Sequence, residues 1–130
     1  MLSKVSLNSL PCLECHEALG MQSGAILDEQ ISASSEGYTH HAAIQGRLNF
    51  KRTAIKSGAW SSGTVDRKQW LQVDLVSYYT RVSHVATQGR DSYDQWVTEY
   101  QLQYGNNGVN FQYYREQGQT VNKVKEMNQK

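Results

Sequence analysis

The sequence predicts an all-β fold, an antiparallel sandwich of short strands. Two observations support this class: apolar and polar residues alternate with a period of two in several short segments, and clusters of Gly, Ser and Asn separate those segments. The 3.6-residue spacing of an amphipathic helix fits none of these segments well. With 130 residues, the chain has the length of one domain and not of two.

Five segments are predicted to be strands: residues 25–32, 70–75, 81–87, 96–104 and 111–115. The first is the weakest and centres on Gln30 and Ile31. In the second, Leu71, Val73 and Leu75 share one face, and the third is short and rich in β-branched residues. In the fourth (WVTEYQLQY), aromatic residues and a Leu lie on one side, and mostly polar residues lie on the other.

The last two predicted strands form a hairpin. Residues 105–108 (GNNG) lie between them, and Gly and Asn tolerate the positive φ that a tight turn requires. The three tryptophans, Trp60, Trp70 and Trp96, are expected to pack in the core or at the base of loops, as large aromatic residues in strand patterns usually do.

Composition excludes several classes of protein. Thirteen Lys and Arg against twelve Asp and Glu give a net charge of +1, which lacks the basic excess of a nucleic-acid binder. The same balance argues against attachment to anionic lipid by charge alone. No apolar run approaches the ~18 residues of a membrane-spanning helix. No catalytic motif is present, so we expect a protein that is not an enzyme.

Three segments are long for hairpin turns: residues 34–43, 57–68 and 89–95. Long loops on a rigid β scaffold are a common platform for ligand binding. The alternative is that they are ordinary surface loops, and composition favours neither interpretation.

Several motifs resemble one family in their order and spacing. They are Cys15, residues 18–35 (ALGMQSGAILDEQISASS), 43–49 (AIQGRLN), 58–60 (GAW), 69–75 (QWLQVDL), 85–90 (VATQGR), 96–100 (WVTEY) and 107–111 (NGVNF). The chain is thereby similar, over residues 15–117, to the coagulation factor V/VIII type C, or discoidin, domain. The resemblance implies a jelly-roll-like β-sandwich of the galactose-binding-domain type. It also implies an extracellular, non-catalytic protein that binds membranes, glycans or proteins through loops at one end.

The ends of the chain depart from that family. The family's domain closes with a cysteine that pairs with the opening one, and Cys15 has no such partner here. The resemblance therefore implies a sandwich that is incomplete at its C-terminus. We expect an N-terminal extension over residues 1–14, a partial discoidin domain over 15–118 and a polar tail over 119–130. Residues 1–10 make a poor secretory signal, so the extracellular location is expected from the resemblance alone.

Cys12, Cys15 and His16 spell C-x-x-C-H, the attachment pattern of c-type haem. The strand-rich pattern that follows argues against haem, and a zinc site would need a second pair of ligands. The remaining alternatives are a local disulfide, two reduced thiols and a bridge between chains.

The first and third long loops hold the candidate ligand-binding residues. Tyr38, His40 and His41 lie together in the first loop, where the rings can stack on a sugar, touch lipid or hydrogen-bond a polar ligand. The loop is otherwise mostly polar, which argues against deep insertion into a membrane. The alternative is a solvated loop without a ligand.

The third loop carries Arg90, Asp91, Tyr93 and Asp94. Arg90 can pair with phosphate or carboxylate, although its position favours a local Arg–Asp pair that shapes the loop. Asp91 and Asp94 can accept bonds from sugar hydroxyls or help to hold Ca²⁺, which is the only cofactor that the sequence suggests. Tyr93 is the stronger ligand candidate in this loop.

These observations predict an adhesion module that recognises a glycan or a cell-surface or matrix protein through its loop tips. Binding to phosphatidylserine membranes is the alternative ligand class. A second hypothesis is a partial domain that only completes its sheet with another chain, through a strand edge or a cysteine bridge.

Overall fold

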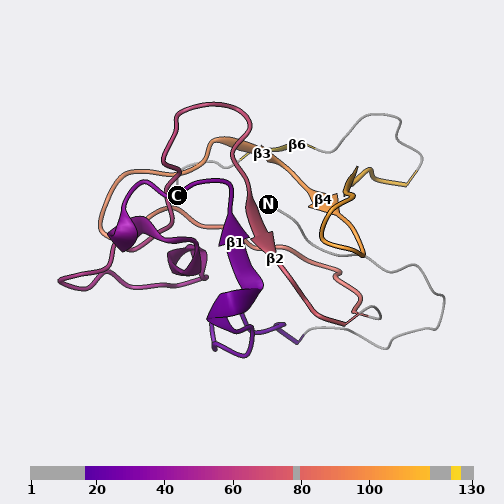
Figure 1. Cartoon of the computed structure of the whole chain (residues 1–130), viewed down its shortest axis with the longest axis horizontal. Helices are drawn as coiled ribbons and strands as arrows, with labels where there is room; N and C mark the ends of the chain where they lie inside the picture. The colour runs from indigo at the N-terminus through magenta and orange to yellow at the C-terminus, as the bar shows by residue number, and fades with distance from the viewer. Residues whose placement is uncertain (1–16, 78–79, 118–123, 127–130) are drawn as a thin grey trace.

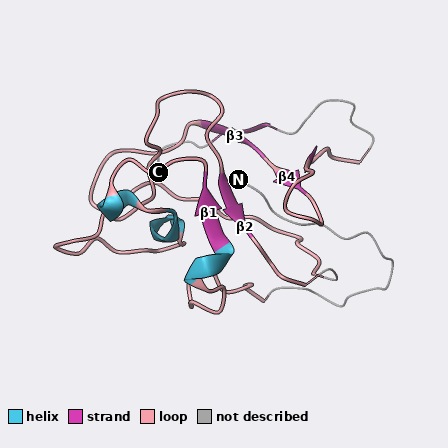
Figure 2. Cartoon of the chain, viewed as in Figure 1, coloured by secondary structure: helices cyan, strands magenta, loops and turns pink. Residues whose placement is uncertain are grey.

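The computed structural model of the chain describes residues 17–77, 80–117 and 124–126 (Figure 1). Within these residues the regular structure consists of six short strands and three turns of 3₁₀ helix (Figure 2). The strands are β1 (Ile31–Ala33), β2 (Leu71–Val73), β3 (Glu99–Gln101), β4 (Gln103–Tyr104), β5 (Gln112–Tyr113) and β6 (Val124–Glu126). The turns are η1 (Asp28–Gln30), η2 (Thr39–His41) and η3 (Ala43–Gly46). The predicted all-β class is confirmed.

All strand pairs are antiparallel: β1 with β2, β3 with β6, and β4 with β5. In the first pair, Ile31 lies opposite Val73 and Ala33 lies opposite Leu71. The backbone pairing of β1 and β2 continues past both ends of the strands, through Ser34 N–H to Trp70 O (3.0 Å) and Asp74 N–H to Gln30 O (2.8 Å). This pair is the centre of the described fold, because the hydrophobic core forms on one of its faces.

The core consists of Ile26, Ile31, Ala43 and Leu71, all buried. The partly buried residues that pack against it are Met21, Ala33, Trp60, Val73 and Leu75. The predicted common face of Leu71, Val73 and Leu75 is thus confirmed. Gly46 of η3 lies so close to Leu71 that a Cβ at this position would meet Leu71 Cδ2 at 2.8 Å. A glycine therefore lets η3 pack directly on the core strand.

The predicted strand over residues 96–104 is divided into β3 and β4. Leu102 separates them; it is buried, and its carbonyl accepts the Tyr114 N–H at 2.9 Å. β3 pairs with β6, whereas β4 pairs with β5, so the two halves of the predicted strand serve different partners. The predicted hairpin is confirmed, with β5 restricted to Gln112–Tyr113.

Two other expectations, for residues 81–87 and for Trp70, differ from the structure. Residues 81–87 form no strand, because no described segment pairs with them in a ladder. Trp70 is 40% exposed rather than packed, because it lies on the side of its segment opposite to Leu71. The predicted polar tail contains β6, which forms backbone pairs with β3. The domain boundaries at residues 14 and 118 stay predictions.

Truncating Leu71 tests the position of the core. Leu71 is 4% exposed and contacts both η3 and the neighbouring strand, so Leu71→Ala should leave a cavity and lower the free energy of unfolding by about 2–5 kcal/mol. Urea unfolding followed by tryptophan fluorescence measures this change. Val109→Ala is the control, because Val109 is 78% exposed and its loss should change stability by less than about 0.5 kcal/mol. If both substitutions lowered the free energy of unfolding equally, the assignment of Leu71 to the core would be wrong.

Candidate ligand-binding loops

The first loop presents an aromatic stack to solvent. The Tyr38 ring, 72% exposed, lies parallel to the His40 ring with centroids 5.4 Å apart, and His40 lies 4.9 Å from the His41 ring. The turn η2 holds these residues, because the His41 N–H donates to Tyr38 O at 2.8 Å. After the turn, the Glu36 carboxylate accepts the Ala43 N–H at 2.7 Å. The stack therefore sits on a short backbone turn with fixed ends.

Residues 57–61, at the start of the second long loop, are hydrogen-bonded to the first loop. The Ser57 N–H donates to His40 O at 2.8 Å, and the Gly37 N–H donates to Ser61 O at 2.8 Å. Trp60 adds a side-chain bond from Nε1 to Ser35 O at 2.9 Å. Backbone groups at both ends of the first loop are thus paired with the segment around residues 57–61.

The third loop, residues 89–95, contacts the segment 57–61 at Gly58. The Asp91 N–H donates to Gly58 O at 3.3 Å, and a Cβ on Gly58 would lie only 2.5 Å from the Cβ of Asp91. Only glycine permits this approach. The structure therefore brings the regions of Tyr38 and Tyr93 to one end of the molecule. Residues 36–41, 51–61 and 90–95 are called the loop cluster below; their ribbons gather at the left of Figure 1.

Asp91 is an internal anchor of the loop cluster. Its carboxylate accepts the Arg52 N–H at 3.0 Å, the Lys51 Nζ at 3.2 Å and the Ser92 hydroxyl at 3.3 Å. The Arg52 N–H, followed by the Lys51 bond, lowers the pKa of Asp91 below its ordinary value of 3.8. Both carboxylate oxygens are thus engaged within the loop cluster, and the predicted roles of Asp91 toward a sugar or Ca²⁺ stay predictions.

The described residues hold no group of three or more His, Cys, Asp or Glu side chains that could bind a metal ion. Asp94, the other candidate calcium ligand, is exposed in the same loop and takes part in interactions within the protein.

Arg90 and Tyr93 form a cation–π contact. The Arg90 guanidinium lies 4.0 Å from the centroid of the Tyr93 ring, and the Arg52 guanidinium lies 5.4 Å from it. Arg90 also donates from Nη1 to Gln95 Oε1 at 2.6 Å. Arg90 therefore shapes the loop through a ring and an amide, contacts that its sequence position alone did not indicate. Tyr93 remains 46% exposed beside these two cations.

Ile55 is a surface residue that the sequence analysis missed. It is 79% exposed at a turn in which the Lys56 N–H donates to Thr53 Oγ1 at 3.0 Å and the Thr53 N–H donates to Lys56 O at 2.9 Å. Its signal in the sequence was an apolar residue between Arg52 and Lys56, outside the three long loops. Val65, the one apolar residue of the middle loop's tip, is fully exposed.

Cys12, Cys15 and His16 lie outside the described residues, so the predicted alternatives for the cysteines stay predictions. No helix among the described residues is long and apolar enough to cross a bilayer.

His41 makes the stability of the loop cluster sensitive to mild acid. Burial, then the positive charge of Arg90, then that of His40 lower the pKa of His41 below 6.5. The unfolded chain then binds a proton more readily than the folded one, so stability is complete above pH 6.5 and falls as the pH drops toward the folded pKa. His41→Gln should flatten this decline in urea unfolding measured between pH 7.5 and pH 5. The exposed His84, changed to Gln, is the control; an equal flattening by both variants would contradict the assignment.

The chain is similar in sequence to known proteins. The F5/8 type C domain family matches residues 30–130. Retinoschisin of Mus musculus is 36% identical over 118 residues, which are 86% of this chain and 51% of that protein. EGF-like repeat and discoidin I-like domain-containing protein 3 of Homo sapiens is 40% identical over 115 residues, 85% of this chain and 24% of that protein. Coagulation factor V of Sus scrofa is 34% identical over 126 residues, 88% of this chain and 5% of that protein.

The chain thus spans about half, or less, of the length of these relatives. The family match includes β1 through β6 and all three segments of the loop cluster. The resemblance drawn from the sequence motifs is confirmed by this match, and the chain belongs to the F5/8 type C domain family.

Proposed function

We propose that this chain is a non-catalytic extracellular binding module that recognises a glycan or a cell-surface or matrix protein through its loop cluster. The observation that carries the proposal is the exposure of Tyr38 and Tyr93 on loops that both bond to the segment 57–61. Exposed Tyr rings on a fixed backbone offer a ligand both an apolar face and a hydroxyl, and Tyr is enriched among residues that dominate binding.

The surroundings of the two rings favour a polar partner. His40 lies against Tyr38, and Lys51 and Arg52 lie around Asp91 and Tyr93. These groups offer hydrogen-bond donors beside flat apolar surfaces, a combination that suits sugar rings and polar protein surfaces. Membership of the F5/8 type C family supports the binding role.

Removing the exposed rings tests this function. Tyr38→Ala and Tyr93→Ala should each weaken binding to the best ligand on a glycan array or a panel of matrix proteins by about 10-fold, because a central aromatic contact is worth more than about 1 kcal/mol. Tyr113→Ala is the matched control, since Tyr113 is 42% exposed on β5, outside the loop cluster. Full binding by both loop variants would reject the proposal.

The proposed contacts need no cofactor. Calcium held by Asp91 and Asp94 is the alternative, and the same binding assay with EDTA separates the two. Unchanged binding is the expected result, because Asp91 is already bonded to Lys51 and Arg52.

An anionic phospholipid surface is a second candidate ligand. The observation that favours it is the exposure of Ile55 between Arg52 and Lys56, with Lys51 nearby. An apolar tip flanked by cations can enter the headgroup region while the cations contact acidic lipid.

Vesicle sedimentation tests this second candidate. If the candidate is correct, the chain binds vesicles containing phosphatidylserine, and Ile55→Ser reduces binding by about fivefold through lost apolar burial. Raising the salt concentration should weaken binding further, because it screens the lysines. Val76→Ser is the matched control, since Val76 is 70% exposed but lies after β2, away from the loop cluster. Absence of vesicle binding would leave the glycan or protein ligand as the function.

A further inference from the structure

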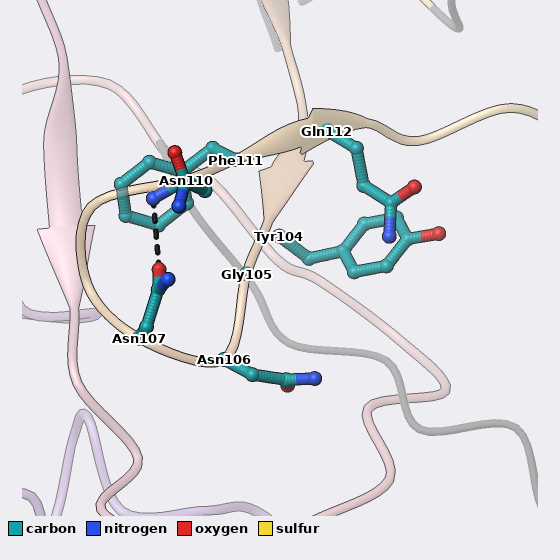
Figure 3. Close-up of a pocket in the computed structure, with 7 residues that line it drawn as sticks. All are labelled: Tyr104, Gly105, Asn106, Asn107, Asn110, Phe111 and Gln112. Atoms are coloured by element: carbon teal, nitrogen blue, oxygen red, sulfur yellow. Dashed lines mark hydrogen bonds between the residues drawn. The ribbon is translucent and has the colours of Figure 1, made fainter.

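The β4–β5 hairpin lines a shallow, open pocket that is separate from the loop cluster. Its volume is about 320 Å³, and residues 104–107 and 110–112 line it (Figure 3). None of these residues belongs to the loop cluster, whose segments all precede β3 in the sequence. In Figure 1 the hairpin lies at the right, on the side away from the loop cluster.

The shape of the hairpin is fixed by a few residues. The Asn107 Oδ1 accepts the N–H groups of Val109 (3.1 Å) and Asn110 (2.8 Å), and Gly108 adopts a positive φ of 69°. A side chain at Gly105 would overlap the Asn110 carbonyl oxygen. Tyr104 lies opposite Gln112 in the strand register. The turn thus depends on Gly105, Asn107 and Gly108. The side-chain amides of Asn106, Asn110 and Gln112 take no part in its hydrogen bonds.

Those other amides supply hydrogen-bonding groups. Within the described part of the chain, no hydrogen bond occupies the side-chain amides of Asn106, Asn110 or Gln112. Each amide offers a carbonyl acceptor and an NH₂ donor. In Figure 3, the side chains of Asn106, Tyr104 and Gln112 extend to the same side of the hairpin, and Gln112 lies alongside the Tyr104 ring. The pocket therefore places uncommitted amides next to an aromatic surface.

The lining selects the class of ligand by its charge and shape. None of the described residues that line the pocket is charged, so an anionic or cationic group would find no counter-charge among them. The half-buried Tyr104 ring offers a flat apolar face, and the neighbouring amides of Asn106 and Gln112 offer paired donors and acceptors. The Phe111 ring extends to the other side of the hairpin (Figure 3). A sugar ring matches both features, because it has a face of C–H groups and an edge of hydroxyls. The volume lies at the lower end of the range for small-ligand pockets, which suits one ring.

We propose that the hairpin pocket binds a single neutral sugar residue, such as the end of a glycan chain. This site is distinct from the loop cluster and does not depend on the function proposed for it.

Amide NMR of the intact ¹⁵N-labelled chain tests the proposal. Three neutral probes are titrated separately to about 50 mM: methyl β-D-galactopyranoside, methyl α-D-glucopyranoside and methyl N-acetyl-β-D-glucosaminide. At least one should give saturable shifts confined to residues 104–112, with a Kd on the order of millimolar, as expected for one sugar in a shallow site. Absence of saturable shifts with all three probes overturns the proposal, and so do shifts located in the loop cluster instead.

Two variants assign the contact. Gln112→Ala should weaken binding of the active probe by about fivefold, the expected effect of losing one or two hydrogen bonds. Gln101→Ala is the matched control, because Gln101 is an exposed amide on β3 outside the pocket, and its loss should leave the Kd unchanged. Equal weakening by both variants overturns the assignment. Tyr38→Ala should leave sugar binding at the hairpin intact, so a failure of the loop-cluster function stays distinguishable from a failure of this one.

Discussion

The close approach of Gly58 to Asp91 is the constraint on which the candidate site depends. It brings a loop that precedes β2 against a loop that precedes β3, and one backbone hydrogen bond joins the two. The segment around Gly58 also holds the first loop: the Ser57 N–H donates to His40 O, and Ser61 O accepts the Gly37 N–H. A side chain at position 58 would collide with the Asp91 Cβ and push the third loop away from this segment. The arrangement of Tyr38 and Tyr93 therefore depends on a residue that carries no functional group.

The core and the candidate site are connected through η3 and Trp60. Ala43 of η3 belongs to the core, and the turn that holds Tyr38 and His40 ends just before it. Trp60 packs against the same core and donates to Ser35 O at the start of the first loop. The core built on the β1–β2 pair thus positions the first loop through η3 and Trp60.

The sequence predicted those features that arise from local pattern. Alternation placed Leu71, Val73 and Leu75 on one face, and the GNNG turn predicted the hairpin, because both depend on neighbouring residues alone. Residues 81–87 have strand propensity, but a strand also needs a partner, and pattern cannot supply that information. The division of residues 96–104 at Leu102 could not be predicted for the same reason, because it depends on the different partners of β3 and β4. The contacts of Arg90 with Tyr93 and of Gly58 with Asp91 join residues through tertiary packing, so no sequence motif indicated them.

The contacts around Tyr93 have a consequence for the rate at which a partner would leave. Two guanidinium groups approach the ring, and one of them is fixed to Gln95. A tyrosine whose rotamer is restrained before encounter loses little conformational entropy when a partner covers it. Preorganisation of this kind lengthens the lifetime of a complex more than it speeds association. If the loop cluster binds as proposed, the cations beside Tyr93 therefore slow the dissociation of its partner.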